Sequence, residues 1–341
     1  MTAPVHDRFF YHSFPRRGTS TLAEVEKGKQ ILTAIRDFGL VLTPQFIEWT
    51  QPTIGESLRT LPVLQKRVCF TELSPKELTG HAEKFGHFSL EFEIETVRRL
   101  GAMPVFYVPQ PTSEATDGSL VGSALLAIAS DLRAVVQRMA MLNEVLHGER
   151  PVESRFNFNV GFADNPDGRS NFTIDRDEAK NFLAAVGHAV TPWSDLRAGS
   201  DALLNFFHPT DNKKTDAALE YYREREWRIA CGLRLKGRDG QPDTDLLRVL
   251  TAPERQRLLE IDHNFFSRKV QTGVGEADTL DQTLVLPGLH SQRVIQMVRR
   301  VIVPASAVAG VAELLRGLDH APPVLALEDL SPQETKKVVA G

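Results

Sequence analysis

The sequence predicts an α+β protein with mixed, mainly antiparallel sheets and flanking helices. Short segments of strand type are numerous, and helical segments are interspersed among them in no regular order. A parallel α/β fold would show a repeated strand–helix alternation instead. The composition, 42% hydrophobic and 25% charged, is that of an ordinary globular protein.

In the first part of the chain, apolar or alternating residues predict strands at 9–12, 40–42, 67–71, 89–93 and 104–109. Helical spacing and end signals predict helices at 22–38, 75–85 and 94–100. Gly39, Gly86 and Gly101 follow these helices, where a residue of positive φ commonly ends a helix. The strand at 40–42 is expected to close at Thr43-Pro44.

The second part of the chain gives a coarser prediction. Helices are expected at 123–146, 175–186, 253–259 and 306–315, strands at 224–231 and 298–303, and loops at 151–170 and 271–283. Leu132, Val135 and Val136 are among the residues expected on the buried face of the first of these helices. We expect one domain over residues 1–320 with a helical insertion at about 119–220, and a loosely attached C-terminal tail at 321–341.

Charge and hydropathy narrow the function classes. The chain has 40 Lys and Arg residues and 44 Asp and Glu residues, a net charge of -4, which argues against general nucleic-acid binding. The N-terminus lacks the apolar core of a signal peptide, and the most apolar stretch, 120–129, is too short to span a bilayer. We therefore expect a cytoplasmic protein without membrane contact. Cys69 and Cys231 lie in apolar runs, as expected of buried thiols in a reducing compartment.

Searches for common catalytic motifs find little. The chain has no G-x-G-x-x-G, no Walker A, no G-x-S-x-G and no H-E-x-x-H sequence. His81 and His87 are six positions apart, which matches no usual zinc-ligand spacing, so no metal is expected.

The segment from Tyr222 to Arg228 is the most informative. On a strand, Glu224, Glu226 and Arg228 project to one face, and the residues between them project to the other. Two carboxylates on one face repel unless a cation or a hydroxylated ligand lies between them. The segment is therefore either a ligand site or a sheet edge with solvated charges, anchored by Trp227.

His12 and Ser13 end the first strand and offer a second site. A neutral imidazole beside a hydroxyl can hold a ligand through hydrogen bonds. The alternative is a histidine whose hydrogen bonds are satisfied by nearby backbone.

The order of these segments resembles that of the AbiGi family of putative abortive phage resistance proteins. The most specific pieces are Cys69-Phe70-Thr71-Glu72 and Glu224-Arg225-Glu226-Trp227-Arg228, and the likeness covers about residues 9–315. It implies a role in phage defence.

A weaker likeness connects the chain with diphtheria-toxin-type ADP-ribosyltransferases. Tyr11-His12-Ser13, then a helix, then Gly39-Leu40, is similar to the opening of those enzymes, and Glu224-Arg225-Glu226 occupies the place of their late catalytic glutamates. Ser13 stands where glycine is usual, and Cys69 where a stacking tyrosine is expected. The resemblance implies an ADP-ribosyltransferase-like core.

This second resemblance also implies roles for particular residues, with NAD as substrate and no metal. Glu226 would accept from a ribose hydroxyl and stabilise the oxocarbenium-like transition state, and Glu224 would position or deprotonate the acceptor. Residues that would bind the dinucleotide or hold the carboxylates are His12, Ser13, Phe70, Tyr107 and Arg228.

Two functions follow from the resemblances. The first is a phage-defence protein with an NAD-dependent ADP-ribosyltransferase-like enzyme domain that modifies a macromolecular acceptor. The alternative is a non-catalytic antitoxin or phage-sensing interaction protein, with a partner defence protein and a degenerate form of the fold. An RNA-directed enzyme is a third reading, which the acidic balance disfavours.

Overall fold

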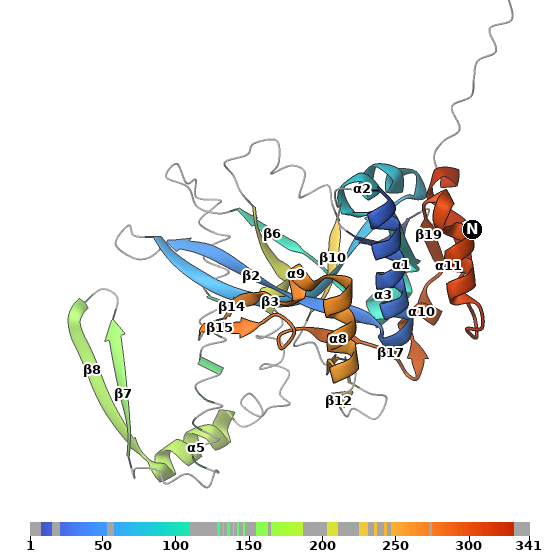
Figure 1. The fold of residues 1–341 in the computed structure, drawn as a ribbon. Coiled ribbons are helices and arrows are strands. Elements are labelled where there is room, and N and C mark those ends of the chain that lie inside the picture. The colour runs from blue at the N-terminus through green and yellow to red at the C-terminus, as the bar shows by residue number, and fades with distance from the viewer. Residues whose placement is uncertain are drawn as a thin grey trace, which may run out of the picture.

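The computed structural model has an α+β fold with mixed, mostly antiparallel sheets and several helices (Figure 1). The residues it describes are 8–15, 21–52, 58–109, 155–162, 165–186, 203–210, 225–230, 235–236, 242–243, 247–272 and 275–330, with 128, 129, 132, 135, 136, 139, 142 and 146. Within these residues, no helix is long and apolar enough to cross a membrane.

A ten-stranded sheet forms the centre of the molecule, in the order β13-β16-β2-β3-β1-β4-β19-β20, with β10 paired to β3 and β5 paired to β10. Every pairing in it is antiparallel except that of β19 with β20. The strands are β1 (Phe9–Phe14), β2 (Leu40–Pro52), β3 (Leu58–Leu73), β4 (Phe88–Phe92), β5 (Met103–Pro104), β10 (Glu226–Ala230), β13 (Arg248–Val249), β16 (Leu284–Leu286), β19 (Arg300–Val303) and β20 (Val324–Ala326).

Smaller two-stranded sheets surround the main one. Their strands are β6 (Phe106–Pro109) with β9 (Phe207–Thr210), β7 (Arg155–Phe162) with β8 (Asn165–Asp175), β11 (Leu235–Lys236) with β12 (Pro242–Asp243), β14 (Lys269–Thr272) with β15 (Gly275–Asp278), and β17 (Gly288–Leu289) with β18 (Gln292–Arg293). The β6–β9 pair is parallel and lies beside the candidate site described below.

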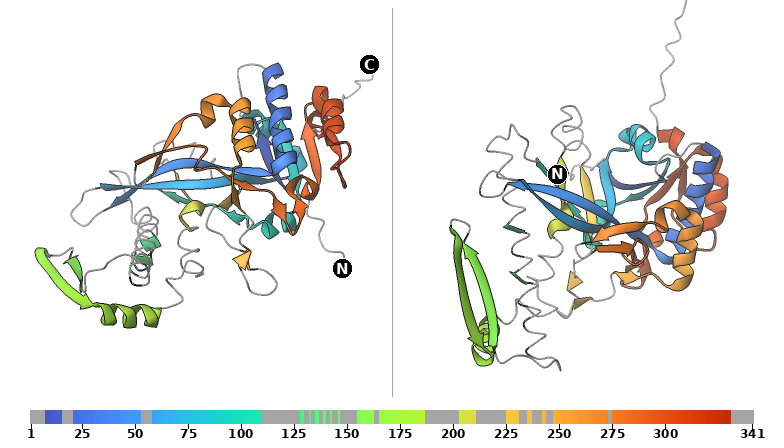
Figure 2. Two further views of the ribbon diagram at one scale, coloured as in Figure 1. Left: turned by 60° about the horizontal axis from the view of Figure 1, so that its bottom comes forward. Right: turned by 60° about the vertical axis from the view of Figure 1, so that its left-hand side comes forward.

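The helices are α1 (Thr21–Phe38), α2 (Leu78–Phe85), α3 (Ile94–Arg99), α5 (Arg176–Val186), α8 (Ala252–Ile261), α9 (His263–Phe266), α10 (Val294–Met297) and α11 (Val308–Leu315), with 3-10 turns at Pro75–Glu77, Ala305–Ala307 and Leu327–Leu330. Figure 2 shows α1, α8 and α11 on one side of the long β2–β3 ribbon and the β7–β8 hairpin with α5 on the other.

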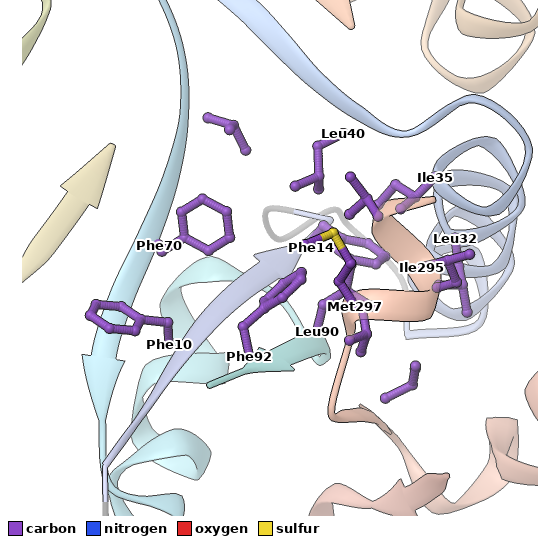
Figure 3. Packing of buried hydrophobic residues seen from close by; sticks show 14 of the residues in the cluster. Phe10, Phe14, Leu32, Ile35, Leu40, Phe70, Leu90, Phe92, Ile295 and Met297 are labelled. Carbon is purple, nitrogen blue, oxygen red and sulfur yellow. The ribbon is translucent and has the colours of Figure 1, made fainter. Parts of the chain in front are cut away.

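The main core lies between the sheet and α1. Phe10, Phe70 and Phe92 come from neighbouring strands and are at most 1% exposed. Leu32 and Ile35, one turn apart on α1, belong to the same cluster and lie on its other side, beyond Phe14 and Met297 (Figure 3). Burying so many large apolar side chains on one face fixes the register of these strands, since a one-residue slip would turn the aromatic rings to the other face.

β1 and β2 both pair with β3, along different stretches of it. Arg67 pairs with both β2 and β10, and Thr71 pairs with both β1 and β10. Because β10 occupies one edge of β3 over residues 67–71, β1 and β2 share the other edge. Among the described residues, none pairs with 68–70 on that edge.

Two expected strand ends are wrong. β2 continues to Pro52 instead of closing at Thr43-Pro44, and β3 begins at Leu58. Pro44 is tolerated because β2 pairs with β16 only over Leu40–Leu42 and with β3 from Thr43 onward. At Pro44 only one edge of β2 is paired, so the missing N–H costs no ladder bond on the other edge.

Three expected loops or tails contain regular structure. The segment 151–170 holds β7 and most of β8, and 271–283 holds part of the β14–β15 hairpin, so the expected helical insertion is not wholly helical. Residues 324–326 of the expected tail form β20, whose parallel pairing with β19 makes them part of the sheet. Long-range pairing of this kind leaves only a weak local signal in sequence.

The helix around residues 128–146 buries only part of the face expected. Val136 is 1% exposed and Ala129 is buried, whereas Leu132 and Val135 are 41% and 44% exposed. Val136 is thus buried as expected, whereas the expected burial of Leu132 and Val135 is wrong.

Candidate functional site

One face of β3 and β10 carries polar side chains, and the other carries the core. Glu226 pairs with Thr71, and Arg228 pairs with Cys69, so these side chains share a face. The opposite face presents Trp227, whose ring packs edge-on against Phe10 at 5.0 Å. The alternation expected for Glu226, Trp227 and Arg228 is therefore what the structure has.

We call the group on the polar face the polar cluster. Some members belong to β3 and β10. The others are side chains from β6, from β9 and from the residues just before β9. They are Gln65, Arg67, Cys69, Tyr107, Asn205, His208, Glu226 and Arg228.

An ion pair between Glu226 and Arg228 is the centre of the polar cluster. The Arg228 Nε atom donates to Glu226 Oε1 at 2.7 Å, and Nη2 donates to Oε2 at 3.3 Å. Tyr107 Oη donates to the same Oε2 at 3.1 Å. The Arg228 side chain is 1% exposed and that of Glu226 is 13% exposed. Both carboxylate oxygens are thus already held by protein donors.

These contacts fix the charge of Glu226. Burial alone would raise the pKa of the carboxyl, but the charge and hydrogen bond of Arg228 outweigh it, helped by the Cys69 thiol and by Arg67, and the pKa falls to about 2. Glu226 is therefore ionised at any physiological pH and cannot act as a general acid.

The Arg228 guanidinium is also held from the other side. Its Nη1 donates to the backbone oxygens of Asn205 and Phe207 at 3.2 and 3.5 Å, and to Gln65 Oε1 at 3.3 Å. Gln65 in turn donates to the Leu204 and Phe207 carbonyls at 2.6 and 2.8 Å. This network ties β10 and β3 to the chain that leads into β9.

Arg67 is a second buried guanidinium in the polar cluster, 9% exposed. It donates to the side-chain oxygens of Gln45 and Gln65. Burial and the nearby Arg228 charge lower its pKa.

Cys69 and His208 are neutral near pH 7. Burial and the Glu226 charge raise the pKa of the Cys69 thiol to about 11, so it is not an activated nucleophile. Burial, followed by repulsion from Arg228 and Arg67, lowers the pKa of His208 to about 4.

His12 lies away from the polar cluster. Its ring is on the core face, with centroids 5.7 Å from Phe14 and 5.8 Å from Phe70. Its Nδ1 is 2.9 Å from the backbone oxygen of Cys69, a carbonyl in the part of β3 that has no strand partner on that edge. The Nδ1 atom therefore carries the proton and donates, and burial lowers the pKa of the ring.

Only some of the other residues expected to bind a ligand lie in the polar cluster. Phe70 is fully buried, in edge contact with Phe92 at 5.5 Å, and the Ser13 hydroxyl shares a hydrogen bond of 2.8 Å with Ser89. The structure brings Tyr107 and Arg228 to Glu226 but leaves His12, Ser13 and Phe70 elsewhere. Glu224 lies outside the described residues.

Sequence reasoning missed Arg67, Gln65, Asn205 and His208. A signal was present for Arg67, because Arg67, Cys69 and Thr71 alternate with the apolar Val68 and Phe70 and so define one polar strand face. Lys66 interrupts this alternation before Gln65. Asn205 and His208 approach from a distant segment, which no local pattern reveals.

A second buried carboxylate, Glu91, also escaped notice because the segment 89–93 was expected to be half-buried. Glu91 is fully buried and accepts from Arg300 at 2.7 and 2.8 Å, from Tyr11 at 2.8 Å, and from Arg299. The guanidinium of Arg299 also lies over the ring of Phe9, 4.3 Å from its centroid. This group is closed by its own partners and joins β1, β4 and β19.

Among the described residues, no cluster of three or more His, Cys, Asp or Glu side chains could hold a metal ion. No family model matches the chain, and neither a curated protein nor a solved structure does.

Proposed function

We propose that this chain is a phage-defence protein that acts by binding a partner, as an antitoxin or phage-sensing interaction protein with a degenerate form of the ADP-ribosyltransferase fold. The defence role rests on the AbiGi resemblance. The choice of binding over catalysis rests on one observation, that both oxygens of Glu226 accept from Arg228.

A glutamate that assists nicotinamide departure needs a free oxygen for a ribose hydroxyl and an uncompensated charge for the developing cation. In Glu226 both oxygens already accept from Arg228, which offsets the charge, and Tyr107 also donates to the Oε2 atom. The His12 imidazole, which would contact the same ligand, lies on the opposite face of the sheet from Glu226, with β3 between them. A dinucleotide would have to displace these protein contacts to reach Glu226.

An NAD-dependent ADP-ribosyltransferase is the second candidate, and one observation favours it. β1, β3 and β10 are neighbours in one sheet, so the expected histidine strand and glutamate strand flank the same central strand. In this case NAD would be the substrate, Glu226 would accept from a ribose hydroxyl, and Tyr107 would orient the carboxylate. His12 would have to give up its bond to the Cys69 carbonyl.

Titration of NAD into the full chain separates the two candidates. We expect no binding heat at millimolar NAD and no NAD consumption, with or without cell extract as a source of acceptor. NAD consumption that disappears in Glu226→Gln, while the variant keeps the wild-type circular dichroism spectrum, would establish the enzyme instead. Glu95→Gln, at an exposed position on α3, is the matched control.

The defence role needs a separate test in cells. Deleting the gene from its host should raise the plating efficiency of at least one phage in a panel, and a plasmid copy of the gene should restore resistance. Unchanged plating of every phage after deletion would remove the defence proposal.

A further inference from the structure

The polar cluster holds two buried cations and one anion. Arg228 is paired with Glu226, whereas Arg67 donates to the amide oxygens of Gln45 and Gln65, contacts the Cys69 side chain, and interacts with the Glu226 charge from a greater distance. Within the described part of the chain, no carboxylate lies within ion-pair distance of the Arg67 guanidinium. Amide oxygens satisfy hydrogen bonds but do not neutralise a charge, so the group retains one excess positive charge in a desolvated place.

The rim of the polar cluster is more open than its floor. The two guanidiniums are at most 9% exposed, whereas Cys69, Tyr107 and His208 are half-buried. The members nearer the solvent are therefore neutral near pH 7, and the two cations lie deeper. His208 is uncharged near pH 7, so it adds no competing positive charge.

We propose that the polar cluster binds a small oxyanion, the carboxylate or phosphoryl group of a ligand, at Arg67 beside the Glu226–Arg228 pair. The planar guanidinium fork matches the paired oxygens of either group, and a hydrogen bond between opposite charges is stronger than the present bonds from the cation to neutral amide oxygens. Tyr107 and His208, whose rings meet edge-on at 6.0 Å, are half-buried and lie nearer the solvent than the two arginines. The inference does not depend on the defence role.

The test is calorimetric titration of the full chain with potassium phosphate and, separately, with potassium acetate, each against potassium chloride of equal ionic strength. Saturable binding of one anion is expected, and the stronger of the two identifies a phosphoryl or a carboxylate ligand. Arg67→Gln should weaken it at least about tenfold, as expected for losing a charged hydrogen bond. Arg98→Gln, at an exposed arginine on α3, should bind like the wild type.

A second measurement on the unaltered chain keeps the proposal testable if Arg67→Gln fails to fold. An anion at Arg67 lies next to Cys69, so it should raise the thiol pKa further and slow alkylation by iodoacetamide roughly threefold at saturation. The Cys69 peptide is followed by mass spectrometry. No saturable heat with either anion, equal binding by Arg67→Gln, or an alkylation rate that neither anion changes would overturn the assignment. None of these three outcomes bears on NAD consumption, which tests the proposed function, so the two proposals fail separately.

Discussion

Replacing Glu226 with glutamine is the sharpest test of the ion pair. The pKa of this carboxyl is about 2 in the folded chain against 4.5 for the free group. A difference of this size corresponds to about 3 kcal/mol of folding free energy, at 1.36 kcal/mol for each pKa unit. The side chain is 13% exposed, so solvent screening reduces this figure little. Glu226→Gln keeps the shape and removes the charge, leaving Arg228 buried beside an amide.

The sign of the pH dependence follows from the direction of the shift. A carboxyl whose pKa is lowered on folding stabilises the protein above the unfolded pKa, and this contribution is lost as pH falls through the folded pKa. The gap between wild type and Glu226→Gln in the free energy of unfolding should therefore be about 3 kcal/mol at pH 7 and about half of that near pH 3.

The assay is urea unfolding of both proteins from pH 7 downward, with exposed Glu95→Gln as a control expected to stay within about 0.5 kcal/mol of the wild type. Combining Glu226→Gln with Arg228→Met should recover much of the loss, because the uncompensated cation is then gone. A Glu226→Gln protein as stable as the wild type at pH 7 would refute this reasoning, and the carboxylate would then be free for a ligand.

Other substitutions test the remaining features. Gly39→Ala should lower stability by more than about 2 kcal/mol, since φ is +111° and a Cβ would lie 2.1 Å from the Leu286 backbone oxygen, whereas Gly80→Ala on α2, with nothing within 4 Å, should raise it by about 0.5–1 kcal/mol. Glu91→Gln should cost about 3–5 kcal/mol, because it leaves buried arginine contacts uncompensated. His12→Ala should cost about 1–3 kcal/mol through the unsatisfied β3 carbonyl, without altering phosphate binding. Thermal and urea unfolding of each variant measures these changes; a neutral Gly39→Ala or His12→Ala would contradict the corresponding contact.

The sequence was most informative where a local rule and the fold agree. Gly39 ends α1 with a positive φ, as its place after the helix predicts, and its amide donates to the Ile35 carbonyl at 3.0 Å. The strand alternation around Trp227 assigned Glu226 and Arg228 to one face and the aromatic ring to the core. Both features depend on residues within one turn or one strand of each other.

The candidate site was harder to predict because distant segments build it. Gln65 and Asn205 are far apart in sequence, and the Lys66 amide donates to the Asn205 side chain at 3.2 Å only because the chain before β9 returns to β3. His12 and Glu226 were expected to share one ligand. Their strands do flank β3, but the two side chains lie on opposite faces of the sheet. Successive residues on β1 face opposite sides, and the aromatic contacts fix His12 on the core side.

The position of the polar cluster itself is evidence about function. Apolar side chains occupy the same sheet face on both sides of it, around Tyr11 at one end and Val63 at the other. A continuous apolar strip would pack the whole face and avoid the cost of desolvating guanidinium groups, since a buried ion pair rarely adds more stability than hydrophobic residues of equal volume. The Glu226–Arg228 pair explains only one of the two cations. Arg67 links Gln45 of β2 to Gln65 of β3, and the anion site proposed above would use the charge that these neutral amide oxygens leave on it.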